Sequence, residues 1–242
     1  MGTPITPYKH NNTSKKEQVA EMFNNIAPKY DFLNELLSLG IHKGWRKKAI
    51  GLLKSKQPKE ILDIATGTGD FAMEALKLKP QRIKGIDISQ GMLAIGREKI
   101  KKSNVDDIIE LQLGDSENLP FETNSFDAIT VGFGVRNFEH LEIGLVEMHR
   151  VLKEGGIACI LEFSKPTVFP IKQFYNFYFR VITPLIGKVF SKDNSAYTYL
   201  PESVKAFPDG NDFLDVLNKA GFKNSRTILL TFGIASIYIA EK

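Results

Sequence analysis

The feature that most constrains the fold is the run from Ile61 to Asp70, where an apolar segment leads through a glycine turn into a helical segment. Gly67 and Gly69 let the backbone turn sharply and approach a ligand where a Cβ would collide. The following helix directs free N–H groups at that ligand. A second apolar run ends at Asp87, a position where a carboxylate usually grips a nucleotide ribose. The sequence therefore predicts a nucleoside-binding crevice.

Two nucleosides compete for this crevice. The spacing Gly67-x-Gly69-x-x-Ala72 fits the dinucleotide fingerprint. However, Asp63 and Asp70 put carboxylates beside the helix N-terminus, where a pyrophosphate would lie, and like charges weaken binding. The sulfonium and ammonium groups of S-adenosylmethionine would be attracted instead. The sequence therefore favours S-adenosylmethionine as the cofactor, although Asp70 alone can also be explained as a helix cap.

The rest of the chain alternates between strand-like and helical patterns, which predicts an α/β protein with a parallel sheet covered on both faces. Two β-like runs around Gly233 predict a C-terminal antiparallel hairpin at the sheet edge. Strands are expected over 60–64, 82–87, 108–113, 126–132, 157–163, 222–230 and 234–240, and helices over 70–78, 90–102 and 139–152.

Three regions are expected. Residues 1–12 carry prolines, a glycine and polar residues and are predicted to be disordered. Residues 13–56 have helical apolar spacing interrupted at Pro28 and Gly40, which predicts a three-helix cap. Residues 57–242 form the main domain, with a lid segment over 164–200.

Composition excludes several functions. The 32 Lys and Arg against 28 Asp and Glu leave a net charge of only +4, too mild to predict nucleic-acid binding. The single Cys159 excludes an internal disulfide and a cysteine-based zinc site, so no metal is expected. No run is long enough to span a membrane and no signal peptide opens the chain, which favours a cytoplasmic protein. The oligomeric state is open, and a homodimer is one arrangement that the chain allows.

Further candidate ligands follow the later strands. Asp115 and Ser116 end the third predicted strand, so they face the same crevice as Thr66 and Asp87. There a carboxylate can accept a hydrogen bond from an adenine amino group. The fourth predicted strand ends in a glycine-rich loop, where Gly132 leaves room for the ligand and Arg136 and Asn137 emerge over the crevice.

Three sequence motifs carry a family resemblance. They are Tyr30-Asp31-x-x-Asn34-x-x-Leu37-Ser38-x-x-x-His42-x-x-Trp45, Gly134-Val135-Arg136-Asn137, and Arg150-Val151-Leu152-Lys153-x-Gly155-Gly156 with Leu161-Glu162-Phe163-Ser164. With these motifs the chain resembles the quinone-biosynthesis C-methyltransferases, which act on demethylmenaquinone or on 2-methoxy-6-polyprenyl-benzoquinol. The resemblance extends from about Lys15 to the end of the chain. The family usually has Pro at Glu154 and often Ser at Gly132.

The resemblance implies a class I S-adenosylmethionine-dependent methyltransferase with a seven-stranded Rossmann-like sheet. Donor contacts are implied at Thr66, Asp87, Asp115 and Ser116. The implied reaction is methylation of a polyprenyl quinol ring, and the run 206–210 favours demethylmenaquinol over a benzoquinol. Two other classes stay open: a nicotinamide-dependent oxidoreductase, and a non-catalytic subunit of this fold that binds lipid or a partner.

Methylation of a ring carbon requires a neighbouring phenol to become phenolate and the carbon to lie about 3–3.5 Å from the methyl group. Arg136 and Asn137 are candidates for stabilising the oxyanion. A base must also accept a proton, and the sequence does not choose among four candidates. Tyr30, on the helical cap, and Glu162 are candidate substrate contacts. The candidate bases are Asp31, His42, His140 and Glu162.

The segment from Pro166 to Phe190 is rich in aromatic residues flanked by lysine and arginine. Such a pattern often marks an amphipathic helix packed on a core. The aromatic residues are too dense for one buried stripe, and exposed aromatics beside cations suit an anionic bilayer surface. We therefore predict a mobile lid, with Phe177 contacting substrate, that opens the acceptor pocket toward the membrane.

Overall fold

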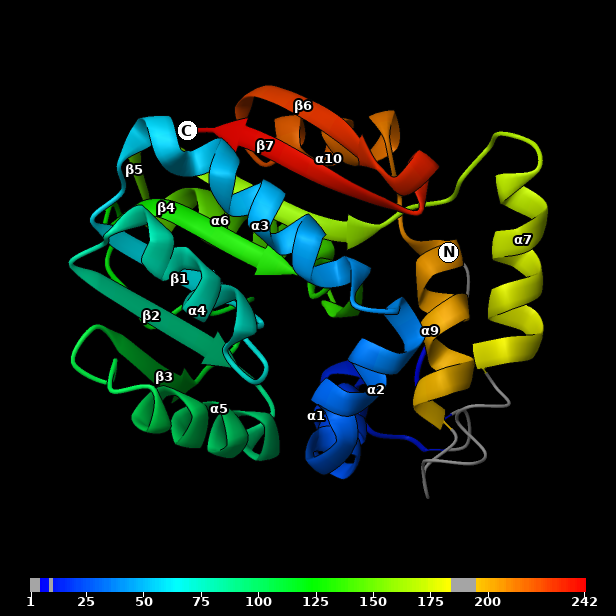
Figure 1. Cartoon of the computed structure of the whole chain (residues 1–242). Helices are drawn as coiled ribbons and strands as arrows, with labels where there is room; N and C mark the ends of the chain where they lie inside the picture. Colours follow the sequence, from blue (N-terminus) through cyan, green and yellow to red (C-terminus); the bar gives the residue numbers. More distant parts are fainter. Residues whose placement is uncertain (1–4, 9–10, 184–194) are drawn as a thin grey trace.

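The computed structural model describes residues 5–8, 11–183 and 195–242. These residues form one sheet in the order β3-β2-β1-β4-β5-β7-β6, in which only β7 is antiparallel to its neighbours. The arrowheads of the parallel strands point to the same edge (Figure 1). The strands are β1 Glu60–Ile64, β2 Arg82–Asp87, β3 Ile109–Leu113, β4 Phe126–Gly132, β5 Leu152–Phe163, β6 Lys223–Leu230 and β7 Ala235–Glu241.

Both faces of the sheet are covered, because its central strands are apolar on both sides. Along β1, Ile61 packs with one core cluster, whereas Leu62 and Ile64 pack with the other, as alternation in a strand requires. The first face is covered by α3 Ile41–Leu53, α4 Asp70–Ala75 and α5 Gln90–Lys102, and the second by α6 Leu141–Val151 and α10 Asn211–Lys219.

A second group of helices lies beyond the carboxyl ends of the strands (Figure 1). A capping box of Ser14 and Glu17 begins the first of these helices. The cap breaks near Pro28 and at Gly40, whose φ is +76°. The group comprises α1 Lys15–Ile26, α2 Tyr30–Ser38, α7 Ile171–Phe177 with a π-helical continuation Tyr178–Ile182, and α9 Ser195–Ala206.

The fold class expected from the sequence is confirmed, including the antiparallel hairpin around Gly233. The strands at 60–64, 82–87 and 126–132 have the expected bounds, but β5 begins at Leu152, five residues before the expected start at Ile157. Residues 1–12 were expected to be disordered. Of these, Ile5 and Tyr8 pack against a buried cluster that includes Val19 and Met22 of α1. Residues 1–4 and 9–10, and residues 184–194 of the predicted lid, lie outside the described residues.

Candidate functional site

The glycine loop after β1 is held from below by Asp63. Its carboxylate is fully buried and accepts hydrogen bonds of 2.6 Å from the hydroxyls of Thr66 and Thr130. Gly67 and Gly69 have φ of +56° and +81°, the left-handed region that favours glycine. Burial raises the pKa of Asp63 to about 6. Asp63 therefore positions the loop from beneath and lines neither of the two cavities described below.

Asp87, at the end of β2, holds the same loop from the side. Its Oδ2 accepts from the N–H of Gly67 and its Oδ1 from the N–H of Ser89, both at 2.8 Å. Burial raises the pKa of Asp87 to about 6. A carboxylate oxygen has more than one acceptor lone pair, so each oxygen can also accept a hydrogen bond from a ligand.

A small cavity with both polar and apolar lining, which we call the donor cavity, opens above these strand ends. Asp87, Asp115, Ser116 and Asn137 line it. The buried Oδ1 of Asn137 has no hydrogen-bond partner among the described residues. Lys16 of α1 lines the cavity and pairs with Asp115. Carboxylates and an orphaned amide oxygen suit a ligand rich in donors, such as a ribose, an amino group or an ammonium, so the residues present fit S-adenosylmethionine.

Gly132 departs from the Ser that is often found in the resembled family, and the structure gives a reason. A Cβ at Gly132 would lie 2.8 Å from the ring of Phe71 in α4. The Phe71 ring is buried and also lines the larger cavity. Space that a serine side chain would take is therefore filled by an aromatic ring.

The larger cavity, which we call the acceptor cavity, has a volume of about 690 Å³. Helices of the second group, together with α3, β5 and the β6–β7 turn, supply most of its wall, and aromatic and aliphatic side chains predominate. Its polar groups include Tyr30, His42 and Arg136. The two cavities share the wall residues Phe23, Tyr30, Ala65, Gly67, Gly132 and Phe133.

Arg136 reaches the acceptor cavity from an ion pair with the fully buried Glu162. Its Nη1 donates to Glu162 Oε1 at 2.7 Å, and its guanidinium carbon lies 5.5 Å from the centre of the Phe163 ring. Its buried Nε has no acceptor among the described residues. Burial raises the pKa of Glu162 although Arg136 opposes the shift. Glu162 lines neither cavity, so it fixes the guanidinium from behind.

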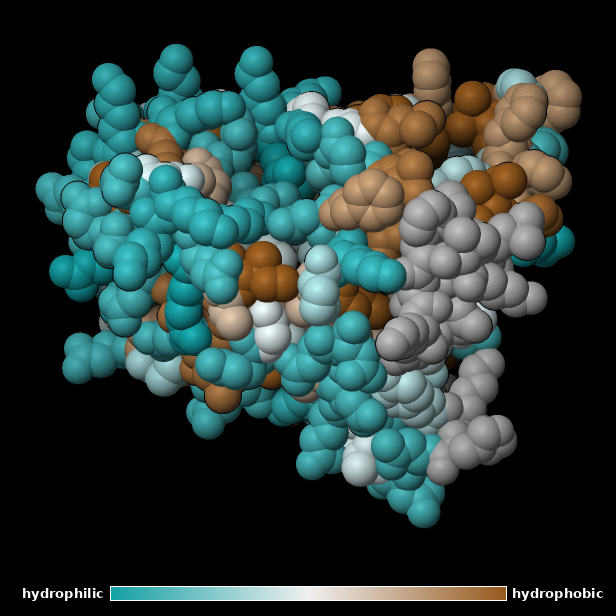
Figure 2. Space-filling view, turned by 60° about the horizontal axis from the view of Figure 1, so that its bottom comes forward, coloured by the Kyte–Doolittle hydropathy of each residue, from teal (hydrophilic) through white to brown (hydrophobic). Residues whose placement is uncertain are grey.

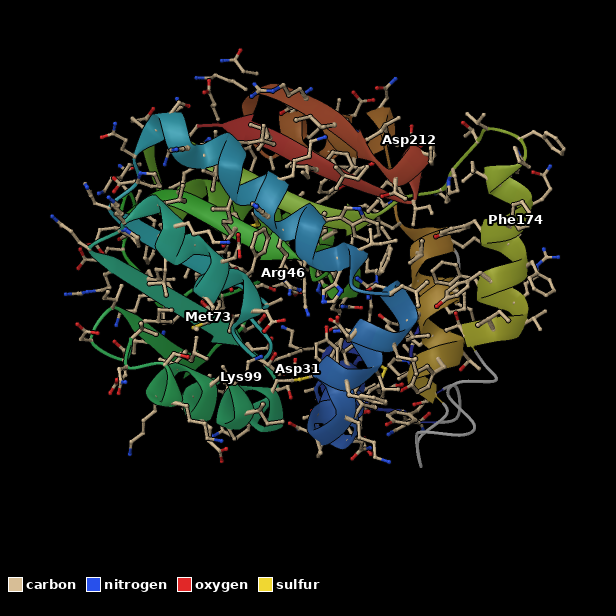
Figure 3. The ribbon with its side chains drawn as sticks, viewed as in Figure 1. Asp31, Arg46, Met73, Lys99, Phe174 and Asp212 are labelled. Atoms are coloured by element: carbon tan, nitrogen blue, oxygen red, sulfur yellow. The ribbon has the colours of Figure 1, made fainter. Side chains whose placement is uncertain are left out.

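A charged cluster closes the glycine loop on its outer side. Lys99 of α5 donates to Asp31 of α2 at 2.8 Å and to Asp70 of α4 at 2.6 Å, and Arg46 of α3 lies 3.0 Å from Asp70. Figure 3 shows Asp31 and Lys99 side by side, with Arg46 above them. Thr68 also donates to Asp31 at 2.7 Å. Asp31 therefore ties the cap to the loop and does not line either cavity.

The structure brings most of the predicted site residues to the cavity walls. Asp31, Asp63, Gly69 and Glu162 stand behind the walls. The sequence reasoning missed Lys16, Arg46 and Lys99, whose carboxylate partners lie 24 or more positions away. It also assigned Trp45 only to the core. Trp45 is buried, but it lines the acceptor cavity as well, and its Nε1 donates to Thr231 at 2.8 Å. The predicted residues at the walls are Tyr30, His42, Thr66, Gly67, Asp87, Asp115, Ser116, Gly132, Arg136, Asn137 and Phe177.

The sheet order and the position of the cavities at the carboxyl edge define the class, that of S-adenosylmethionine-dependent methyltransferases. Two solved structures share the fold. A Thermotoga maritima S-adenosylmethionine-dependent methyltransferase superposes with a TM-score of 0.63 at 20% identity, covering 92% of this chain and 99% of that one. One from Methanococcus maripaludis, described as a putative S-adenosylmethionine-dependent methyltransferase, gives 0.60 at 20% identity over 97% of both chains.

The chain belongs to the ubiE/COQ5 methyltransferase family, whose model matches residues 11–242. A demethylmenaquinone methyltransferase of Bacteroides fragilis is 51% identical over 98% of this chain and 97% of its own length. A ubiquinone/menaquinone biosynthesis C-methyltransferase of Geotalea uraniireducens is 45% identical over 95% of this chain and 98% of its own length. The resemblance read from the motifs is confirmed, and the chain is a methyltransferase.

Proposed function

We propose that this chain transfers a methyl group from S-adenosylmethionine to a ring carbon of a polyprenyl quinol, with demethylmenaquinol as the acceptor. The observation that carries the proposal is the shared wall between a small cavity that holds two strand-end carboxylates and a predominantly apolar cavity of about 690 Å³. Water-excluding aromatic walls suit a planar ring with a hydrocarbon tail. The Bacteroides fragilis relative bears the name of the same reaction.

S-adenosylmethionine, when bound, supplies an electrophilic methyl group. The residues of this chain have three tasks beside it. Asp87 and Asp115 hold the donor through its hydrogen-bond donors. The aromatic wall excludes water from the ring. Arg136, already neutralised by Glu162, offers a free Nε, and this N–H can stabilise the negative charge of a quinol oxygen as it develops. Asn137 lines the donor cavity, where its unpaired Oδ1 can position the donor.

The test is single-turnover methyl transfer to a naphthoquinol and to a benzoquinol, measured side by side with the same purified protein. Transfer to the naphthoquinol with a clear excess in kcat/KM supports the proposal. Preference for the benzoquinol would move the assignment to ubiquinone biosynthesis. No transfer to either ring would overturn the quinol assignment. Calorimetry with S-adenosylmethionine against NAD tests the cofactor independently.

The proposal includes transient contact with a membrane surface. Leu39, Phe174, Phe177 and Phe232 line the acceptor cavity, yet their exposed fractions are 83%, 69%, 57% and 74%. Apolar residues gather over α7 and the β6–β7 turn, whereas the opposite part of this face is mostly hydrophilic (Figure 2). Patches of this kind mark interaction surfaces. We assign the protein to the cytoplasm, peripheral to the inner face of the membrane, and none of the described helices is long and apolar enough to cross a bilayer.

Phe177→Glu tests this contact, because a carboxylate on the patch is repelled by anionic lipid. We expect weaker binding to anionic phospholipid vesicles and lower activity on long-chain quinols, while activity on a short-chain soluble quinol survives. Ile143→Glu is the matched control, since Ile143 is 49% exposed on α6 and lines neither cavity. Equal loss on both substrates with unchanged vesicle binding would show that Phe177 only packs within the protein and does not contact the membrane.

The oligomeric state is a separate question. Light scattering of the purified protein tests the homodimer that the sequence allows.

A further inference from the structure

We propose that His42 is the base that accepts the quinol proton during methyl transfer, with Nε2 as the accepting atom and Ser38 as the residue that positions the ring. This inference rests on the proposed function and identifies a catalytic group within it. Two observations support it: which titratable side chains line the acceptor cavity, and which of these side chains already form hydrogen bonds or ion pairs with other residues.

Three of the four bases considered from the sequence are engaged elsewhere. Asp31 is bound by Lys99 and Thr68 behind the wall. Glu162 is enclosed behind Arg136. His140 is exposed and bound to Glu117, away from the acceptor cavity. Among the described residues, His42 is the only one of the four that lines this cavity.

Other titratable groups on the cavity wall are poor bases. Asp70 lines the cavity, but Arg46 and Lys99 pair with it and hold its pKa below its usual range, although burial opposes this shift. Burial raises the pKa of the wall tyrosines Tyr30, Tyr175, Tyr178 and Tyr199, so these side chains stay protonated. Arginine side chains do not give up their proton in proteins. A buried histidine with one free nitrogen is therefore the group best suited to accept the proton.

Ser38 determines which nitrogen of His42 is free. The Ser38 hydroxyl donates to the carbonyl oxygen of Asn34 at 2.7 Å, one turn back on α2. Its oxygen is then an acceptor for His42, so the hydrogen bond between them is donated by the Nδ1–H of the imidazole. A neutral imidazole with its proton on Nδ1 has its lone pair on Nε2. The serine thus fixes the tautomer in which Nε2 is a base.

The surroundings of Nε2 also supply a route for the proton to leave. Glu35 Oε2 lies 4.0 Å from Nε2, and the Glu35 side chain is 49% exposed, whereas that of His42 is 8% exposed. Burial and Arg46 lower the pKa of His42, Lys43 adds to the shift, and Glu35 and Asp70 oppose it. His42 is therefore neutral near pH 7. It can return its proton to solvent on the side where Glu35 pairs with Lys43, whose Nζ lies 2.8 Å from Glu35 Oε2.

Methyl transfer to the ring requires one proton to leave the quinol. A quinol O–H bond breaks and its proton binds Nε2, leaving a phenolate. The ring carbon forms a bond to the methyl carbon while the electron pair of the carbon–sulfur bond stays with sulfur. The ring C–H proton then returns to the oxygen and restores the phenol. One proton is released in total, and it leaves through His42 to solvent.

His42→Asn is the decisive variant, because its side-chain NH₂ can still donate to Ser38 while the Nε2 base is gone. We expect single-turnover methyl transfer to a naphthoquinol to fall by roughly 10²- to 10³-fold at pH 7. The remaining rate should rise about tenfold per pH unit toward the ionisation of the phenol near pH 10, where base catalysis is no longer needed. S-adenosylmethionine affinity by calorimetry should not change, which also reports on folding. Free imidazole should restore part of the activity of His42→Gly.

Ser38→Ala should give a smaller loss than His42→Asn, because it releases the tautomer without removing the base. His149→Gln is the control: His149 lies near the C-terminus of α6 and lines neither cavity. If His42→Asn keeps the wild-type rate, or loses activity by the same factor at every pH without rescue, His42 is not the base. If the wild-type protein methylates no quinol, the proposed function fails and this inference fails with it.

Discussion

The donor cavity and the acceptor cavity share a wall but are built in different ways. The donor cavity is lined largely by residues at the ends of consecutive parallel strands, where backbone N–H groups, carboxylates and glycines meet. The acceptor cavity is enclosed mostly by helices from both ends of the chain, and aromatic and aliphatic side chains predominate on its wall. The first is defined by the sheet, and the second by how separate helices pack.

This difference separates two properties of the enzyme. A site held by hydrogen bonds to the backbone has little freedom to change, because each lost contact leaves a buried polar group unpaired. An apolar wall tolerates substitutions that conserve volume. We infer that donor recognition is the constrained property and that ring and tail preference can change through the helices.

The largest expected effect breaks the donor side alone. Asp87→Ala should weaken S-adenosylmethionine binding by roughly 2–4 kcal/mol, because hydroxyl donors of the ligand and the N–H of Gly67 lose a charged acceptor. Calorimetry measures the dissociation constant, and binding of a naphthoquinone analogue should be unchanged. Asp127→Ala is the matched control, because Asp127 also accepts from two backbone N–H groups, of Lys59 and Glu60, but at the opposite edge of the sheet. An unchanged donor affinity in the Asp87 variant would remove Asp87 from the site.

The same division explains what could be predicted from the sequence. Strand ends have local signatures, so Asp87, Asp115 and Ser116 of the donor cavity could be identified, as could Thr66, which lines the acceptor cavity. The alternation of strand-like and helical segments predicted the sheet. The positions of helices around a cavity depend on long-range packing, which has no local signature. Trp45 therefore looked like core alone, although it contacts the β6–β7 turn 186 positions away. For the same reason Asp31 seemed to face the substrate, whereas Lys99 holds it outside the cavity.

An intermediate effect tests whether Arg136 belongs to the acceptor side. Arg136→Lys keeps a charge near Glu162 but loses the planar fork and the free Nε–H. We expect turnover to fall about tenfold to a hundredfold, or about 1.4–2.7 kcal/mol of transition-state stabilisation, with donor affinity nearly intact. Quenched single-turnover assays measure the rate of methyl transfer, and calorimetry on the same preparation measures the affinity for the donor. A parallel fall in donor affinity would make Arg136 a cofactor ligand or a structural residue.

The smallest expected effect is a pH dependence confined to the donor side. Burial raises the pKa of Asp87 to about 6, and its ionised form is the better acceptor for ribose hydroxyls. Affinity for S-adenosylmethionine should therefore be constant above about pH 7 and weaken as the pH falls through about 6. The steepest expected loss of affinity is tenfold per pH unit, which corresponds to about 1.4 kcal/mol of binding free energy. Folding stability should change in the opposite direction. Because the folded state binds this proton more tightly than the unfolded chain, the contribution of Asp87 to stability is full below about pH 4 and is lost as the pH rises through 6.

Asp63 has a pKa raised to about the same value but lines neither cavity, so it separates the two causes of the pH effect. Asp87→Asn should flatten the profile of donor affinity between pH 5 and 7, because the titrating acceptor is gone. Asp63→Asn should leave the acidic limb in place, since its amide oxygen can accept from one of the two threonines, Thr66 or Thr130, and its NH₂ can donate to the hydroxyl oxygen of the other beneath the loop. Calorimetric titrations across that range measure the affinity, and urea unfolding at the same pH values measures the opposite trend in stability. If Asp63→Asn removes the limb and Asp87→Asn keeps it, the donor is sensed through the loop and not through direct contact with Asp87.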